Sequence, residues 1–222
     1  MTDILAMGEG LVEFVRMPEF KNGQPVYRRG FGGDTSNTVI AAARQGASTG
    51  YISAVGGDPF GVELMALWAR EGVCTNLIKV KKQDPTGVYF VDPHPSGRRF
   101  SYARRGSAAS NFSSQDLDES AIKNTRILHV SAISLAISAT MCEAVFRACE
   151  IARDAGVKVS LDTNLRLNLW TLEKARKTIF DLLPLANFVF PSDDEAEQLL
   201  GTRDTTVTLD HFSKFDADCV VL

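Results

Sequence analysis

Short apolar segments alternate with longer helical ones along most of this chain, and this alternation restricts its fold more than any other feature. Segment 51–55 reads as a buried strand, and Asp58-Pro59 then supplies a helix cap and a first helical residue, with Gly72 closing that helix. Such alternation predicts an α/β fold in which helices flank a mainly parallel sheet. The expected strands are 4–7, 51–55, 77–80, 127–131, 157–161, 187–190 and 218–222, and the expected helices are 38–45, 59–71, 139–155, 172–183 and 193–200.

Two segments, 11–30 and 86–105, interrupt the alternation with strands joined by turns. Asn22-Gly23 marks the turn of the first segment and 93–97 the turn of the second. We expect the two segments to pair as a small antiparallel sheet beside the main domain. The core is then formed by 1–10, 31–85 and 106–222, and the small sheet by 11–30 and 86–105.

Composition and charge exclude several classes of protein. Hydrophobic residues make up 45% of the 222 residues and charged residues 23%, which is ordinary for a globular protein. A net charge of -3 argues against a general nucleic-acid binder. The chain has no run of about 18 apolar residues and no signal-peptide pattern at its start, so we expect no membrane association and a cytoplasmic location.

Several familiar site signatures are absent. The chain contains neither GxxxxGK[ST] nor a GxGxxG after its first strand, and it has no GxSxG or HExxH. His129 lies in an apolar strand and is expected in the core or near the site. No cysteine pair has CxxC spacing, so we expect free buried thiols. The cysteines are Cys74, Cys142, Cys149 and Cys219.

Ligands bind beyond the carboxyl ends of the strands in open α/β sheets, and polar residues gather at these positions here. In Gly32–Asn37, glycines allow close backbone approach to a ligand and the following helix offers free N–H groups; a plain tight turn is the alternative. Asp162, Asn164 and Arg166 alternate after a strand. Arg166 there suits a carboxylate or phosphate, and a solvated loop with an ordinary ion pair fits equally well.

Two further clusters carry charge. Glu195 opens a helix, where a carboxylate is favoured by the helix dipole, and the acidic run 193–195 could equally serve a divalent cation. Tyr102 and Arg104 share one face of a hairpin strand. Arginines crowd this hairpin, and they indicate either solubilising charge or a site for an anionic small molecule. They are Arg98, Arg99, Arg104 and Arg105, with Arg28 and Arg29 nearby.

Ordered motifs extend along the chain: Gly8–Phe14, Gly32–Asn37, Val55–Gly61, Thr86–Phe90, Tyr102–Ser110 and Asp162–Arg166. Together they resemble the ribokinase-like (PfkB) carbohydrate kinases. The last two segments are similar to those of the 2-keto-3-deoxygluconate kinases within that family. The resemblance implies an α/β core with a β-sheet lid over the sugar. It also implies transfer of the ATP γ-phosphoryl group, with Mg²⁺, to the 6-hydroxyl of 2-keto-3-deoxygluconate.

The resemblance also implies roles for individual residues. Gly33, Asp34, Thr35, Ser36 and Asn37 would hold sugar hydroxyls, Tyr89, Tyr102 and Arg104 would reach in from the lid, and Arg166 would contact the substrate. Asn164, Leu165, Arg166 and Ser192 would border the nucleotide, and Glu195 would organise the magnesium and phosphate region. The arginine cluster would suit the substrate's carboxylate. A homodimer formed through the lid is also expected.

Three departures from the family pattern qualify these expectations. Ser192 stands where the family usually has Asn, and Ala103 replaces a residue that is often Tyr. The second family signature, which ends in Gly-Ala-Gly-Asp and carries the general base, does not occur in the 222 residues. We therefore expect the base beyond Leu222, and a chain that is inactive as it stands.

Two other functions fit the same motifs. The first is another PfkB sugar kinase, such as a fructokinase or a 5-keto-2-deoxygluconate kinase. The second is a non-catalytic module that binds sugar acids.

Overall fold

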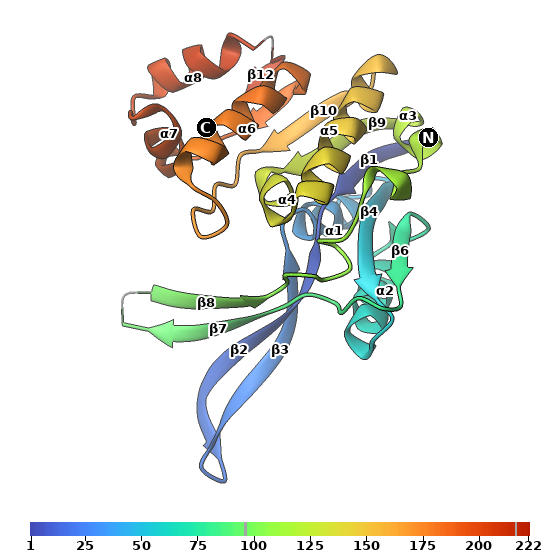
Figure 1. Ribbon diagram of the computed structural model, residues 1–222, viewed down its shortest axis with the longest axis vertical. Coiled ribbons are helices and arrows are strands. Elements are labelled where there is room, and N and C mark those ends of the chain that lie inside the picture. Colours follow the sequence, from blue (N-terminus) through green and yellow to red (C-terminus); the bar gives the residue numbers. More distant parts are fainter. Residues whose placement is uncertain (96, 216) are drawn as a thin grey trace.

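The structure is a computed structural model that describes residues 1–95, 97–215 and 217–222. Its main sheet contains β1 Thr2–Met7, β4 Thr49–Gly56, β5 Val73–Cys74, β6 Ile78–Lys81, β9 Thr125–Ser131, β10 Lys158–Asp162, β11 Phe188–Phe190 and β12 Cys219–Val220. The strand order is β12-β11-β10-β9-β1-β4-β5, and β6 also pairs with β4. All strand pairs of this sheet in the described residues are parallel. The expected α/β architecture is confirmed (Figure 1).

The helices are α1 Ser36–Arg44, α2 Pro59–Arg70, α3 Glu119–Lys123, α4 Ala132–Ile137, α5 Ala139–Asp154, α6 Leu172–Leu182, α7 Asp193–Leu200 and α8 Thr205–Ser213, with 3-10 turns at Ser114–Asp116 and Leu183–Leu185. The predicted start of α2 is confirmed, because Asp58 accepts a hydrogen bond of 2.8 Å from the Gly61 N–H. Gly72 follows with φ +80°. The sequence analysis did not predict α3, α4 and α8. These helices are short. The β-branched residues of α8 also have low helix propensity, and this helix forms because the buried Phe212 packs against the core.

Helices cover the two faces of the main sheet unequally. Leu5 and Met7 point into the larger core, which α5 and α6 cover. Ala6, between them, points to the opposite face and packs in the smaller core with residues of α1 and α2. Trp68 of α2 anchors this second core, because its buried ring packs edge-on against Tyr51 at 5.0 Å and its Nε1 donates to Ser36 at 2.9 Å.

The lid is a separate four-stranded sheet that projects from the core (Figure 1). It contains β2 Gly10–Lys21, β3 Gln24–Gly33, β7 Val88–His94 and β8 Gly97–Ala103, in the order β3-β2-β7-β8. The expectation of an antiparallel sheet was wrong at its centre, since β2 and β7 pair in parallel, with Val12 beside Val88. Both strands run outward directly from the core, so they point the same way. Ser96, in the expected turn 93–97, lies outside the described residues.

The cysteines differ from the expectation in their burial. All four are free, as predicted, but only Cys149 is buried. Cys74 and Cys219 are exposed, because they lie in β5 and β12 at the two ends of the sheet, and Cys142 is half-buried. No helix in the described part of the chain is long and apolar enough to cross a bilayer.

Candidate sugar and nucleotide site

A cavity of about 260 Å³ lies where the lid joins the core. It brings together side chains from the loop after β1, the entrance to α1, the lid strands and the loop after β10. Eight residues that the sequence analysis selected line it: Gly33, Asp34, Asn37, Tyr89, Tyr102, Arg104, Asn164 and Arg166. The other selected residues, Thr35, Ser36, Leu165, Ser192 and Glu195, do not line it.

Asp34 is held rigidly at the floor of this cavity. Its Oδ1 accepts hydrogen bonds from the Glu9 N–H at 2.8 Å and the Thr35 N–H at 2.6 Å. Its Oδ2 accepts from the hydroxyl of Ser134 in α4. Burial raises the pKa of Asp34, while these hydrogen bonds act in the opposite direction. The result is a fixed acceptor that suits hydroxyl groups.

Gly33 is required by its backbone. Its φ of +147° is unfavourable for other residues, and a Cβ there would lie 2.2 Å from the Glu9 carbonyl oxygen. The next residues turn away from the cavity, since Thr35 Oγ1 lies 3.4 Å from the Tyr51 hydroxyl and Ser36 accepts from Trp68. Thr35 and Ser36 therefore hold the wall from behind, while Asn37 is exposed at its rim.

Arg104 enters the cavity as one half of a buried ion pair. It follows β8, and its Nη1 donates to Glu9 Oε1, beyond the end of β1. Glu9 is fully buried, and its Oε2 has no hydrogen-bond partner among the described residues. Burial raises the pKa of Glu9 to about 7, Arg104 lowers it and Asp34 raises it further. This pair joins the lid to the core across 95 positions of the sequence.

Aromatic rings form the lid side of the cavity. Tyr89 stacks on Tyr102 with centroids 5.7 Å apart, and Phe100 stacks on Tyr102 at 6.4 Å. The Tyr89 hydroxyl donates to Glu13 at 2.7 Å. Arg104 lies 4.6 Å over the Tyr102 ring, as their shared strand face predicted. The three rings thus form one stacked cluster on the lid side of the cavity.

Four lining residues received no individual role in the sequence analysis: Glu9, Leu11, Phe100 and Ile133. Phe100 had a usable signal, because it lies two positions before Tyr102 and therefore on the same strand face. Glu9 had a weaker signal: it lies just after a strand, and ligands bind beyond the carboxyl ends of strands. No pattern distinguished Leu11 or Ile133 from ordinary core residues.

The loop after β10 supplies the remaining wall. Asn164 has φ +25°, and its N–H donates to Asp162 Oδ1 at 3.2 Å, which is an Asx-type turn. Burial raises the pKa of Asp162 to about 6, and Glu195 adds to this. Arg166 keeps 51% of its side chain exposed and donates to the Leu165 carbonyl at 2.8 Å. Its charge is therefore open to a ligand.

Glu195 stabilises this loop through both carboxylate oxygens. Its Oε1 accepts from the Leu165 N–H at 2.8 Å, and its Oε2 accepts from the Thr163 hydroxyl at 2.7 Å and the Ser192 N–H at 3.1 Å. The Ser192 hydroxyl oxygen accepts a hydrogen bond from the Glu195 N–H, which completes a capping box on α7. Glu195 thus has three of its acceptor positions occupied by this loop and by the start of α7. The described residues contain no cluster of three or more His, Cys, Asp or Glu suited to a metal ion.

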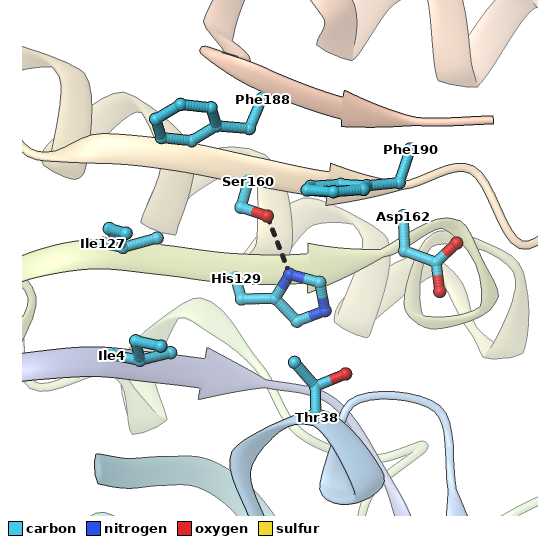
Figure 2. Close-up of a pocket in the computed structure, with 8 residues that line it drawn as sticks. All are labelled: Ile4, Thr38, Ile127, His129, Ser160, Asp162, Phe188 and Phe190. Carbon is cyan, nitrogen blue, oxygen red and sulfur yellow. Dashed lines mark hydrogen bonds between the residues drawn. The ribbon is translucent and has the colours of Figure 1, made fainter. Parts of the chain in front are cut away.

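A second cavity, of about 570 Å³, lies on the sheet face that carries α1 (Figure 2). Register places His129 beside Ala6 and Ser160 beside His129, so all three share this face. The face is covered over β1 and β4 and open across β9 to β11, where Phe190 keeps 40% of its surface exposed. Figure 2 shows its lining: Ile4, Thr38, Ile127, His129, Ser160, Asp162, Phe188 and Phe190.

His129 in this cavity is a neutral side chain. Its Nδ1 lies 2.9 Å from the Ser160 hydroxyl, and its Nε2 is buried without a hydrogen-bond partner among the described residues (Figure 2). Burial lowers the pKa of His129 to about 4. The ring is therefore uncharged at neutral pH, and this apolar face is suited to packing rather than to proton transfer.

Comparison with known proteins gives the family. The family model for pfkB family carbohydrate kinases matches residues 1–221. The chain belongs to the pfkB family of carbohydrate kinases. It is 34% identical over 210 residues to the 2-dehydro-3-deoxygluconokinase of Thermoproteus tenax, covering 92% of this chain and 63% of that protein. The expected family and ribokinase-like fold are thus confirmed.

Solved structures of pfkB proteins have the same fold. A PfkB protein from Polaromonas sp. JS666 matches with a TM-score of 0.93 and 31% identity, over 100% of this chain and 76% of that one. Fructokinase from Xylella fastidiosa with bound ATP matches with a TM-score of 0.86 and 26% identity, over 100% of this chain and 72% of that one. The chain therefore spans only part of its pfkB relatives, and about 63% of the curated Thermoproteus protein.

Proposed function

We propose that this chain forms the sugar-binding part of an ATP-dependent kinase that phosphorylates the 6-hydroxyl of 2-keto-3-deoxygluconate. One observation carries the proposal: a single cavity combines a fixed carboxylate, an aromatic wall and an arginine, Arg166, whose charge is open. Carboxylates and aromatic faces suit sugar hydroxyls and sugar rings, and arginines suit an acid. The likeness to 2-dehydro-3-deoxygluconokinases, at about a third identity, supports the same substrate.

Within this proposal the cavity residues divide by chemistry. Asp34 accepts hydrogen bonds from the sugar hydroxyls, and the Asn37 amide can both accept and donate them. Gly33 lets the backbone approach the sugar closely. Tyr89 and Tyr102 cover its ring from the lid. Thr35 and Ser36 act indirectly, because their hydroxyls are bonded behind the wall.

The nucleotide side is proposed along the loop after β10. Asn164, Leu165 and Arg166 border the phosphates, with Arg166 as the charged contact. Ser192 and Glu195 act by holding this loop through the capping box and the bond to Leu165. ATP would bring Mg²⁺ bound to its own phosphates and water, which is how this ion commonly binds, and Glu195 would act on this region through the loop that it holds.

An assay of ADP formation with ATP, Mg²⁺ and 2-keto-3-deoxygluconate tests the reaction. Kinases commonly turn over at about 1–100 s⁻¹. The 222 residues contain no Gly-Ala-Gly-Asp, and a general base contributes about 10²–10⁴-fold. We therefore expect this chain alone to run at least about a hundredfold below the usual range. Turnover within the usual range would contradict the expectation that the general base lies outside these 222 residues.

A fructokinase is the second candidate. It is favoured by one observation, the pairing of Arg104 with Glu9, which removes net positive charge from the cavity. The likeness to the Xylella fastidiosa fructokinase, at 26% identity, also supports this candidate, because both proteins have the pfkB fold. Competition between fructose and 2-keto-3-deoxygluconate separates the two, since a kinase of the acid binds the carboxylate-bearing ligand more tightly.

The pairing of two lids into a homodimer stays a prediction, which analytical ultracentrifugation can check.

A further inference from the structure

The two arginines of the cavity differ in how much of their charge is available. Arg104 is buried, ion-paired with Glu9 and covered by the Tyr102 ring. Arg166 is half exposed, and its nearest carboxylate oxygen, Glu195 Oε1 at 3.7 Å, already accepts from the Leu165 N–H. A charge that already has a buried counter-ion attracts a ligand anion far less than an open one.

The surroundings of Arg104 reinforce this difference. Two carboxylates, Glu9 and Asp34, lie on its side of the cavity, and Asp34 is tied to the Glu9 N–H. One guanidinium therefore faces two acidic groups. Once both are ionised, a ligand carboxylate beside Arg104 would meet net negative charge in a poorly solvated place, where like-charge repulsion is strong.

We propose that Glu9 determines the charge specificity of the cavity. It holds Arg104 as an internal ion pair, so that a carboxylate-bearing ligand is recognised by Arg166 and only uncharged groups of the ligand face Arg104. This inference rests on the proposed function for its choice of sugar acid as ligand. Glu9 acts through Arg104 and is a positioning residue.

Calorimetric titration at pH 8, with 2-keto-3-deoxygluconate and with fructose, tests the division of roles. The measured quantity is the ratio of the two dissociation constants. We expect Arg166→Met to lower the preference for the acid about tenfold or more, because it removes a charge-assisted contact. The double change Glu9→Gln with Arg104→Met removes the pair as a whole and should leave the ratio within about twofold. An equal loss of preference in both proteins would overturn the proposal.

A second measurement is independent of any sugar. Glu9→Gln removes the counter-ion of Arg104 and opens a cationic site. We expect acetate, a simple carboxylate, to raise the thermal unfolding temperature of this variant more than that of the unchanged chain, in which only Arg166 is open to it. Glu13→Gln is the matched control, because Glu13 accepts a hydrogen bond from Tyr89 rather than from an arginine. An acetate response equal to that of the control contradicts the proposal.

The two measurements separate the inference from the function on which it rests. If the unchanged chain binds neither sugar while Glu9→Gln responds to acetate, the proposed function fails and the pairing of Arg104 stands. If both sugars bind and Arg166→Met keeps its preference for the acid, the inference fails and the proposed function stands. If Glu9→Gln does not fold, the comparison of Arg166→Met with the double variant still decides.

Discussion

Buried carboxyl groups make single residues of the cavity sensitive to pH. Glu9 has a pKa of about 7 in the folded chain, against an ordinary value of 4.5. The unfolded chain loses this proton near pH 4.5 and the folded chain only near pH 7. The contribution of Glu9 to stability is therefore fully present below about pH 4.5 and is lost as the pH rises through 7.

Glu9→Gln should remove this pH dependence. We expect the free energy of unfolding of the unchanged chain, measured relative to the variant, to fall between pH 5 and about pH 7 and to level off by pH 8. Urea unfolding at several pH values in this range measures it. The comparison uses the slope with pH, because the variant also changes the contact with Arg104 and so shifts the absolute stability. A difference that rises with pH would show that Arg104 outweighs burial and keeps Glu9 ionised.

Gly33 provides a prediction about backbone strain. Gly33→Ala should cost about 3 kcal/mol of stability, because the new Cβ meets the Glu9 carbonyl at 2.2 Å in addition to the unfavourable φ. Gly46→Ala is the control, since Gly46 also has a positive φ, +91°, but open space around it. We expect it to cost about 1 kcal/mol. Equal losses in chemical denaturation would argue against a close approach at Gly33.

At the scale of elements, the start of α2 is tied to the entry of the lid. Asp58 caps α2, and it also accepts from the Thr86 N–H and hydroxyl, each at 2.7 Å. Burial alone would raise the pKa of Asp58, but the hydrogen bonds from Thr86 and Gly61 lower it overall. One side chain thus fixes a core helix and the segment that leads into β7.

Asp58→Ala should therefore cost more than the loss of an ordinary cap. We expect about 2–3 kcal/mol, from one cap and two further hydrogen bonds. Asp204→Ala is the control, because Asp204 caps α8 through a single bond to the Val207 N–H. That change should cost about 1 kcal/mol. Urea unfolding checks both values, and losses of equal size would contradict the link to the lid.

The elements also show which parts of the fold were predictable. The strands of the main sheet and the cap of α2 follow from local patterns, apolar runs and an Asp-Pro pair, except for the two-residue β5, which was not predicted. The parallel pairing of β2 with β7 does not, because it depends on where two distant segments leave the core. The ion pair of Glu9 with Arg104 was hidden for the same reason: each residue is unremarkable in its own segment, and 95 positions separate them.

At the scale of the whole molecule, one face of the main sheet is incompletely covered. Parallel sheets normally have both faces covered, and here the helices on the side of α1 pack over β1, β4, β5 and β6 but not over β9 to β11 in the described residues. Phe188 and Phe190 lie on the open part (Figure 2). The longer relatives contain further chain that this sequence does not match.

The open face should bind an apolar dye. We expect anilinonaphthalene sulfonate to fluoresce strongly with the folded chain, and Phe190→Ser to reduce the signal roughly by half. Phe20→Ser is the control, because Phe20 is 61% exposed on β2 of the lid, away from this face. Equal signals from both variants and the unchanged chain would show that this face is already covered in solution.

The central claim is that the cavity between lid and core is a sugar-acid site. The most direct test is a calorimetric titration of the 222-residue chain at pH 8 with 2-keto-3-deoxygluconate, with fructose as the comparison. The account predicts saturable binding at one site, with the acid bound at least about tenfold more tightly because Arg166 adds a charge-assisted contact. No saturable binding of either ligand, or fructose bound as tightly as the acid, would contradict it.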